Sequence, residues 1–187
     1  MRVLGLDLSL TSTGLAEVSG GEVTGNWRIR SQGRREATLE ERDERISSVV
    51  QQVHEIVNDV DHDLFVVENP SYGSQVGSQH DRSGLWWLVV DMLLAFGRVA
   101  TVPPNTRALY AAGRGNAGKE EVFNAAVSNI PGEEVVEIAR LGWRQGNDLA
   151  DALVLAAMGA RRLGEPVLGE RTHARTDEAL EGAAWPS

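Results

Sequence analysis

The apolar residues in the first thirty positions form short runs separated by small and polar residues. The runs cover residues 2–8, 14–18 and 22–30, and the pair Gly20-Gly21 supplies a turn signal before the third run. Short apolar runs joined by tight turns are typical of neighbouring β-strands. We therefore predict three strands that form an antiparallel meander.

After this meander, helical and strand patterns alternate. Residues 36–60 place their apolar side chains on one stripe opposite a charged face, as in a surface helix. The same reasoning predicts buried strands at 64–67 and 99–102, and helices at 85–96, from 103 onward, at 119–129 and at 148–163. A meander followed by strand–helix alternation predicts an α/β fold. We expect a mixed sheet, with three antiparallel strands followed by parallel strands, and helices on both faces.

Only the C-terminal end differs in composition from the rest. Residues 164–187 contain five acids, two arginines and two prolines, and they have little periodicity. Such a segment buries too little apolar surface to order itself. We expect one domain over residues 1–163 and a mostly disordered tail over 164–187, in which Trp185 is a candidate local anchor.

The composition is that of a soluble globular protein without disulfides. The chain has 187 residues and no cysteine, and its first residues lack the apolar run of a signal peptide. No stretch approaches the roughly 20 apolar residues of a membrane span. We therefore expect a cytoplasmic protein without membrane association. The formal net charge of −9, from 27 acidic and 18 basic residues, counts against a nucleic-acid partner unless the basic residues cluster.

Two clusters of basic residues reverse the sign of the charge locally. Residues 92–119 contain no acid, and we expect their basic side chains to meet phosphates: Arg98, Arg107, Arg114 and Lys119. A second cluster lies near the third strand: Arg28, Arg30, Arg34 and Arg35. The acidic total therefore does not exclude DNA.

Four acids occupy positions that a solvated helix face does not explain. Asp7 ends the first strand and Glu68 the fourth, while Asp148 and Asp151 share one face of the last helix, for which Asn147 is a candidate N-cap. If the two strands are neighbours, the four carboxylates come together. Such an oxygen-only set suits two Mg²⁺ or Mn²⁺ ions, which can clamp a phosphodiester during in-line displacement. The alternative is a helix cap at Asp148 and solvated strand ends at the other positions.

The chain resembles the RuvC family of Holliday junction resolvases, within the RNase H-like superfamily. The resemblance rests on four motifs in the family's order, which span most of residues 5–163: GLDLSLTSTG at 5–14, VVE at 66–68, GRGNAGK at 113–119 and DLADAL at 148–153. The sequence departs from the family at Leu8-Ser9, where the family usually has Pro-Gly. This departure concerns the geometry of the first turn and leaves its acid in place.

The resemblance implies roles for individual residues. The metal ligands would be Asp7, Glu68, Asp148 and Asp151. Lys119, the only lysine of the chain, would face the scissile phosphate. The family also has a basic residue about eleven positions before this lysine, and Arg107 is the nearest candidate. Tyr72 would be the aromatic wedge that stacks on junction bases.

The predicted helix at 85–96 is a candidate dimer interface. Trp86 and Trp87 are adjacent, so they point to different faces of the helix and are hard to bury together in one small domain. The RuvC family dimerises through this helix. We expect a homodimer, which suits a two-fold-symmetric junction.

These features predict a metal-dependent, structure-selective endodeoxyribonuclease of DNA recombination and repair, which cleaves Holliday junctions or other branched DNA. A non-catalytic branched-DNA binding module is one alternative, although it predicts loss of a site acid. An actin-like or sugar-kinase-type ATPase fragment is another, but such proteins need a second glycine-rich phosphate loop. The exact branched substrate, any cleavage-sequence preference and a bacterial or phage origin stay open.

Overall fold

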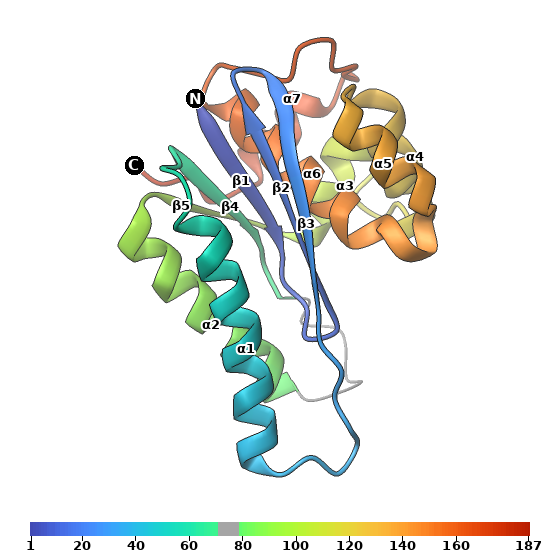
Figure 1. The fold of residues 1–187 in the computed structure, drawn as a ribbon. Helices are drawn as coiled ribbons and strands as arrows, with labels where there is room; N and C mark the ends of the chain where they lie inside the picture. Colours follow the sequence, from blue (N-terminus) through green and yellow to red (C-terminus); the bar gives the residue numbers. More distant parts are fainter. Residues whose placement is uncertain (71–78) are drawn as a thin grey trace.

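The centre of the molecule is a five-stranded mixed sheet in the order β3-β2-β1-β4-β5 (Figure 1). The computed structural model describes residues 1–70 and 79–187. The strands are β1 (Arg2–Asp7), β2 (Ser12–Ser19), β3 (Glu22–Arg30), β4 (Leu64–Glu68) and β5 (Val99–Val102). The first three form the predicted antiparallel meander, and β4 and β5 extend the sheet in parallel beside β1. The predicted mixed α/β sheet is confirmed.

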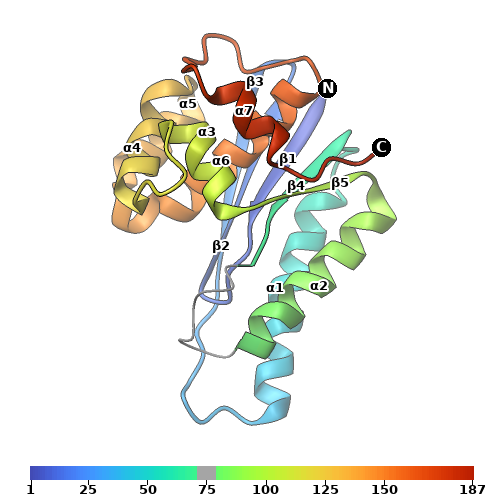
Figure 2. The ribbon, with the colours of Figure 1, turned by 180° about the vertical axis from the view of Figure 1, so that it is seen from behind.

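Helices cover both faces of this sheet, also as predicted (Figures 1 and 2). The helices are α1 (Leu39–Val57), α2 (Gln79–Phe96), α3 (Pro104–Ala112), α4 (Lys119–Asn129), α5 (Glu133–Leu141), α6 (Trp143–Arg162) and α7 (Thr176–Glu181). One apolar cluster joins α1 and α2 to sheet residues such as Leu4 and Phe65. The other cluster packs helices α3, α4, α5 and α6 against side chains on the opposite face of the sheet, such as Val3 and Val66. Alternation along each strand thus gives the sheet two buried faces. None of the helices among the described residues combines the length and the hydrophobicity that a membrane span requires.

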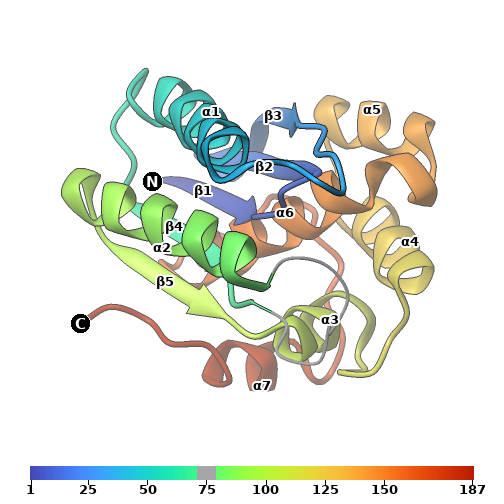
Figure 3. The same ribbon diagram turned by 90° about the horizontal axis from the view of Figure 1, so that it is seen from below.

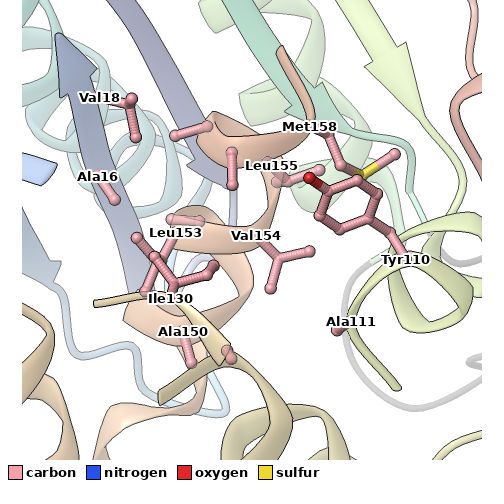
Figure 4. Packing of buried hydrophobic residues seen from close by; sticks show 14 of the residues in the cluster. Ala16, Val18, Tyr110, Ala111, Ile130, Ala150, Leu153, Val154, Leu155 and Met158 are labelled. Carbon is pink, nitrogen blue, oxygen red and sulfur yellow. The ribbon is translucent and has the colours of Figure 1, made fainter. Parts of the chain in front are cut away.

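Helix α6 lies almost against the backbone of the sheet. A Cβ atom at Gly5 would overlap the carbonyl oxygen of Ala152, and one at Gly14 would overlap that of Asp148. Figure 4 shows Leu153 and Val154 of α6 in the apolar layer between β2 and α3. The two glycines therefore set how closely α6 approaches β1 and β2.

Two helix boundaries and two whole helices, α5 and α7, differ from the sequence prediction. Helix α6 begins at Trp143 rather than near Asp148, and its N-cap is Gly142 rather than Asn147. Helix α2 begins at Gln79, six residues before the predicted start. Helix α5 was not predicted at all. The first turn of α2 is polar, and that of α6 contains Trp143 as its only large apolar residue, so the regular apolar pattern of both helices starts later than their backbone hydrogen bonds.

Residues 164–187 differ from the expectation of a mostly disordered tail. Val167 and Ala179 are buried in the core, and the single short helix α7 packs along α3. The backbone of Ala184 then pairs with Thr101 of β5 through two hydrogen bonds of 2.9 and 3.0 Å. Trp185 donates its indole N–H to the carbonyl of Leu180. A few well-spaced apolar residues and one backbone pairing thus dock a segment whose composition is polar. The domain boundary at residue 163 stays a prediction.

Candidate active site

Asp7 and Glu68 lie side by side at one end of the sheet. Each is the last residue of its strand, and the parallel register pairs the preceding residues, Leu6 with Val67. Figure 3 views this end of the molecule and places the end of β1 next to β4 and α6. The condition under which the sequence brings Asp7 and Glu68 together, that their two strands are neighbours, is therefore met by the topology.

Helix α6 contributes the two other predicted acids. Asp148 and Asp151 are both buried, and they lie in the second and third turns of the helix rather than at its N-terminus. Gly14 has no side chain, so the backbone of α6 at Asp148 packs directly against β2. This close packing brings the carboxylates of the helix to the strand ends. The alternative of a simple helix cap at Asp148 is wrong.

Asp148 is held by two partners that the sequence reasoning did not assign to the site. The Ser12 hydroxyl donates a hydrogen bond to Asp148 Oδ2, and Arg28 Nε lies 3.3 Å from the same oxygen. Arg28 pairs with Gly14 across the β2–β3 hairpin. A hairpin register extended from the Gly20-Gly21 turn would place Trp27 opposite Gly14. An irregularity in the pairing between Glu17 and Val18 shifts the register by one residue and brings Arg28 there instead, so the sequence carried no signal for this contact.

Arg107 of α3 bridges two of the four carboxylates. Its Nε lies 2.6 Å from Glu68 Oε1, and its Nη1 donates to Asp151 Oδ1. The side chain is buried. Burial alone would lower the pKa of Arg107, but the negative charges of Asp151 and Glu68 outweigh it and raise that pKa. The guanidinium therefore faces the site carboxylates as an internal counter-charge, and its predicted contact with DNA stays a prediction.

Crowding of buried carboxylates shifts the protonation of the site. Burial raises the pKa of Asp7 well above its ordinary value, and the charges of Glu68 and Asp151 add to the effect. Burial also raises the pKa of Asp151 to about 7, although Arg107 opposes the shift. Groups whose pKa is strongly shifted by burial and by a specific charge partner are candidates for functional residues.

Two of the three remaining predicted site residues are described by the structure, and both are exposed. Lys119 is the first residue of α4 and is exposed, and its positive charge lowers the pKa of Asp151, so it lies within electrostatic reach of the cluster. Arg114 is exposed and pairs with Glu121, with Nε 3.2 Å from Oε1. Tyr72, the predicted wedge, lies outside the described residues.

The donor chemistry of the site fits a hard divalent cation. Four carboxylates supply the oxygen ligands that Mg²⁺ and Mn²⁺ prefer. The raised pKa values of Asp7 and Asp151 reflect excess negative charge that such a cation would relieve. Among the described residues, no group of three acidic or histidine side chains is placed to share one ion. Arg107 contacts both Glu68 and Asp151. Arg107 thus neutralises part of the site in this arrangement.

Solved structures of Holliday junction resolvases share this fold. Thermus thermophilus RuvC is 20% identical, covers 88% of this chain over 98% of its own, and superposes with a TM-score of 0.63. The same protein in complex with Holliday junction substrate gives 19% identity, coverage of 88% and 97%, and a TM-score of 0.64. The fowlpox virus resolvase in complex with substrate Holliday junction DNA gives 11% identity, coverage of 87% and 99%, and a TM-score of 0.56. No protein-family model matches the sequence, and no curated protein does. The chain therefore has the RNase H-like α/β fold that RuvC and other Holliday junction resolvases share.

Proposed function

We propose that the protein is a metal-dependent endodeoxyribonuclease that cleaves Holliday junctions or other branched DNA. The observation that carries this proposal is that four carboxylates, from β1, β4 and α6, each interact electrostatically with at least one other at one end of an RNase H-like sheet. All four acids are present in this chain, whereas a purely DNA-binding relative could have lost one of them. The fold likeness to resolvases that were solved with Holliday junction DNA favours branched DNA as the substrate.

In the proposed mechanism, two ions of Mg²⁺ or Mn²⁺ held by Asp7, Glu68, Asp148 and Asp151 would supply Lewis acidity and an activated water for phosphodiester hydrolysis. Ser12 and Arg28 orient the Asp148 carboxylate, since both contact the same oxygen. Such outer partners hold a ligand in its binding geometry.

Lys119 would face the scissile phosphate and stabilise the charge that develops on it. Its ammonium is a compact point charge, whereas an arginine is a planar fork, so it suits contact with a single phosphate oxygen. Its position as the exposed first residue of α4 leaves it accessible to a strand that lies across the acids.

We also propose that the active form is a homodimer assembled through α2. Trp86 is half-buried and donates its indole N–H to the carbonyl of Glu68, at 2.9 Å. The Trp87 ring packs edge-to-face against that of Trp86, with ring centroids 4.9 Å apart, but it is 64% exposed, and Leu88 and Leu94 of the same helix are also exposed. An exposed apolar helix face of this kind is typical of a protein–protein interface. Trp86 belongs to the proposed interface helix and hydrogen-bonds to the backbone of Glu68, a proposed metal ligand. The proposed interface and the proposed site are therefore in direct contact.

Cleavage of matched DNA substrates tests the proposed function. In Mg²⁺, a synthetic four-way junction should be cut, while a linear duplex of the same arm sequence should stay intact. Omission of the metal should abolish cleavage. Binding of the junction without cleavage in any divalent metal would favour the binding module instead, and saturable ATP hydrolysis without DNA cleavage would favour the ATPase.

A further inference from the structure

An arginine-rich hollow of about 1040 Å³ lies beside the carboxylates. Its walls are the turn after β1, the segment 31–38 between β3 and α1, and the first turns of α1 and α2. Five arginines and two acids line it, a net charge of +3, whereas the whole chain carries −9. We call it the arginine hollow. Because Ser9 and Thr11 belong to its wall and follow Asp7 closely in the chain, it adjoins the candidate active site.

One arginine of the hollow is fixed in place by neutral partners. Arg45 donates from Nε to the Ser31 hydroxyl at 2.9 Å and from Nη2 to the Leu10 carbonyl at 2.6 Å. Its Nη1 makes no hydrogen bond to any described residue, and it lies where a Cβ atom of Gly33 would be. The absence of a side chain at position 33 therefore makes room for the guanidinium. None of these partners is charged, so the positive charge of Arg45 is not neutralised by them.

The other charges of the hollow divide into paired and unpaired groups. Arg34 pairs with Glu41 at 2.7 Å, and Arg42 of α1 pairs with Asp81 of α2. Within each pair the two charges neutralise each other, and the second pair also links α1 to α2. Arg35 is exposed and makes no ion pair with any described residue. Arg35 and Arg45 thus leave positive charge in the hollow without a carboxylate partner.

We propose that the arginine hollow binds the phosphodiester backbone of a DNA arm next to the cleavage site. This inference rests on the proposed function and adds to it the surface that holds the arm. A guanidinium matches the geometry of a phosphate group, and hydroxyls such as those of Ser9 and Thr11 also donate to phosphate oxygens. On a protein of net charge −9, a local positive surface must supply most of the electrostatic attraction.

Equilibrium binding of a fluorescent four-way junction in EDTA, measured over a range of salt concentrations, tests the proposal. Arg35→Ala should raise Kd roughly three- to tenfold and reduce the slope of log K against log salt by about one, since each phosphate contact contributes about that much. Gly33→Val should also raise Kd, because it displaces the Arg45 guanidinium without changing any charge. Arg162→Ala is the matched control: it removes an exposed arginine at the C-terminal end of α6, which packs at the opposite end of the sheet from the hollow.

The outcomes separate this inference from the proposed function. If Arg35→Ala and Gly33→Val bind like Arg162→Ala, with unchanged melting temperatures, the hollow does not hold DNA and the proposal is overturned. A wild-type protein that binds the junction but never cleaves it would refute the proposed nuclease activity. The salt dependence of Kd in the variants would then still test whether the arginine hollow binds DNA. A wild-type protein that does not bind the junction would refute both.

Discussion

Single residues at the end of the sheet explain why the site is costly to fold without metal. Burial and mutual repulsion raise the pKa values of Asp7 and Asp151, and Arg107 offsets only part of the cost. The four acids could be predicted from the sequence because each interrupts or follows an apolar pattern. The contact of Arg107 with two of them could not, because it depends on how α3 packs beside α6. The roles of Ser12 and Arg28 likewise depend on the hairpin register.

The raised pKa of Asp151 makes the stability of the metal-free protein fall as the pH rises. Its pKa increases from an ordinary 3.8 to about 7 on folding, so the native state binds the proton more tightly than the unfolded state. The stabilisation is complete below about pH 4 and is lost as the pH rises through about 7. Asp151→Asn should therefore raise the free energy of unfolding at pH 8 in EDTA, by about 1–3 kcal/mol, and not at pH 4. Urea unfolding at both pH values measures this, and an equal effect at the two would contradict it.

Removal of Arg107 should have the opposite effect on the metal-free protein. Arg107→Met leaves Glu68 and Asp151 without their buried partner, which should cost about 3 kcal/mol of stability in EDTA. Mn²⁺ should then raise the melting temperature more in the variant than in the wild type, because the cation replaces the lost charge.

The control for this experiment is Arg140→Met, which breaks an exposed pair with Glu137 on α5. It should leave both the melting temperature and its response to Mn²⁺ at wild-type values. An identical response to Mn²⁺ in the wild type and in Arg107→Met would contradict the role of Arg107 as an internal counter-charge.

At the scale of the elements, the hydrophobic pattern predicted those helices and strands that keep the same buried face along their whole length. All five strands and the helices α1, α3 and α4 were predicted close to their observed bounds, because their apolar residues mark their buried faces. Helix α5 and the first turn of α6 were missed, since Gly142 both ends one helix and begins the next, and after Trp143 the first turn of α6 has no apolar side chain. Such boundaries are decided by packing against α4 and β3, which a single-sequence pattern does not contain.

The exposed face of α2 should control the oligomeric state. Trp87→Glu places a charge where an apolar side chain is 64% exposed, so it should convert a dimer into a monomer. Light scattering during size-exclusion chromatography measures the mass directly. Val136→Glu, at a 50% exposed apolar position on α5, is the matched control and should stay dimeric. A Trp87→Glu protein of dimeric mass would rule out this interface.

At the scale of the whole molecule, the C-terminal segment connects the sheet edge to the helical layer that carries Arg107. Glu170 accepts hydrogen bonds from Tyr110 of α3 at 2.7 Å and from Arg161 of α6 at 2.8 Å. His173 also contacts the backbone carbonyl of Tyr110, and Ala184 covers the edge of β5. The composition of this segment did not predict such docking, because only a few of its residues are apolar. Its contacts come from particular polar partners far away in the sequence.

Loss of the Glu170 carboxylate should weaken the whole fold. Glu170→Gln removes the charge that pairs with Arg161 and weakens the hydrogen bond from Tyr110, so it should cost about 1–3 kcal/mol of unfolding free energy. Glu178→Gln, which affects only an exposed pair with Arg175, should cause no measurable change. Urea unfolding of both variants measures the difference. Equal stabilities would mean that the Glu170 network does not fasten the segment.

The most direct test of the proposed nuclease is the cleavage of a four-way junction in Mg²⁺ by the wild type and by Asp148→Asn. Asp148→Asn keeps the size and the Ser12 contact of the side chain but removes the charge of a proposed ligand, so the cleavage rate should fall by about 100-fold or more. Asp43→Asn, an exposed acid on α1, should cleave at the wild-type rate. Cleavage by Asp148→Asn at the wild-type rate would contradict the assignment of the site.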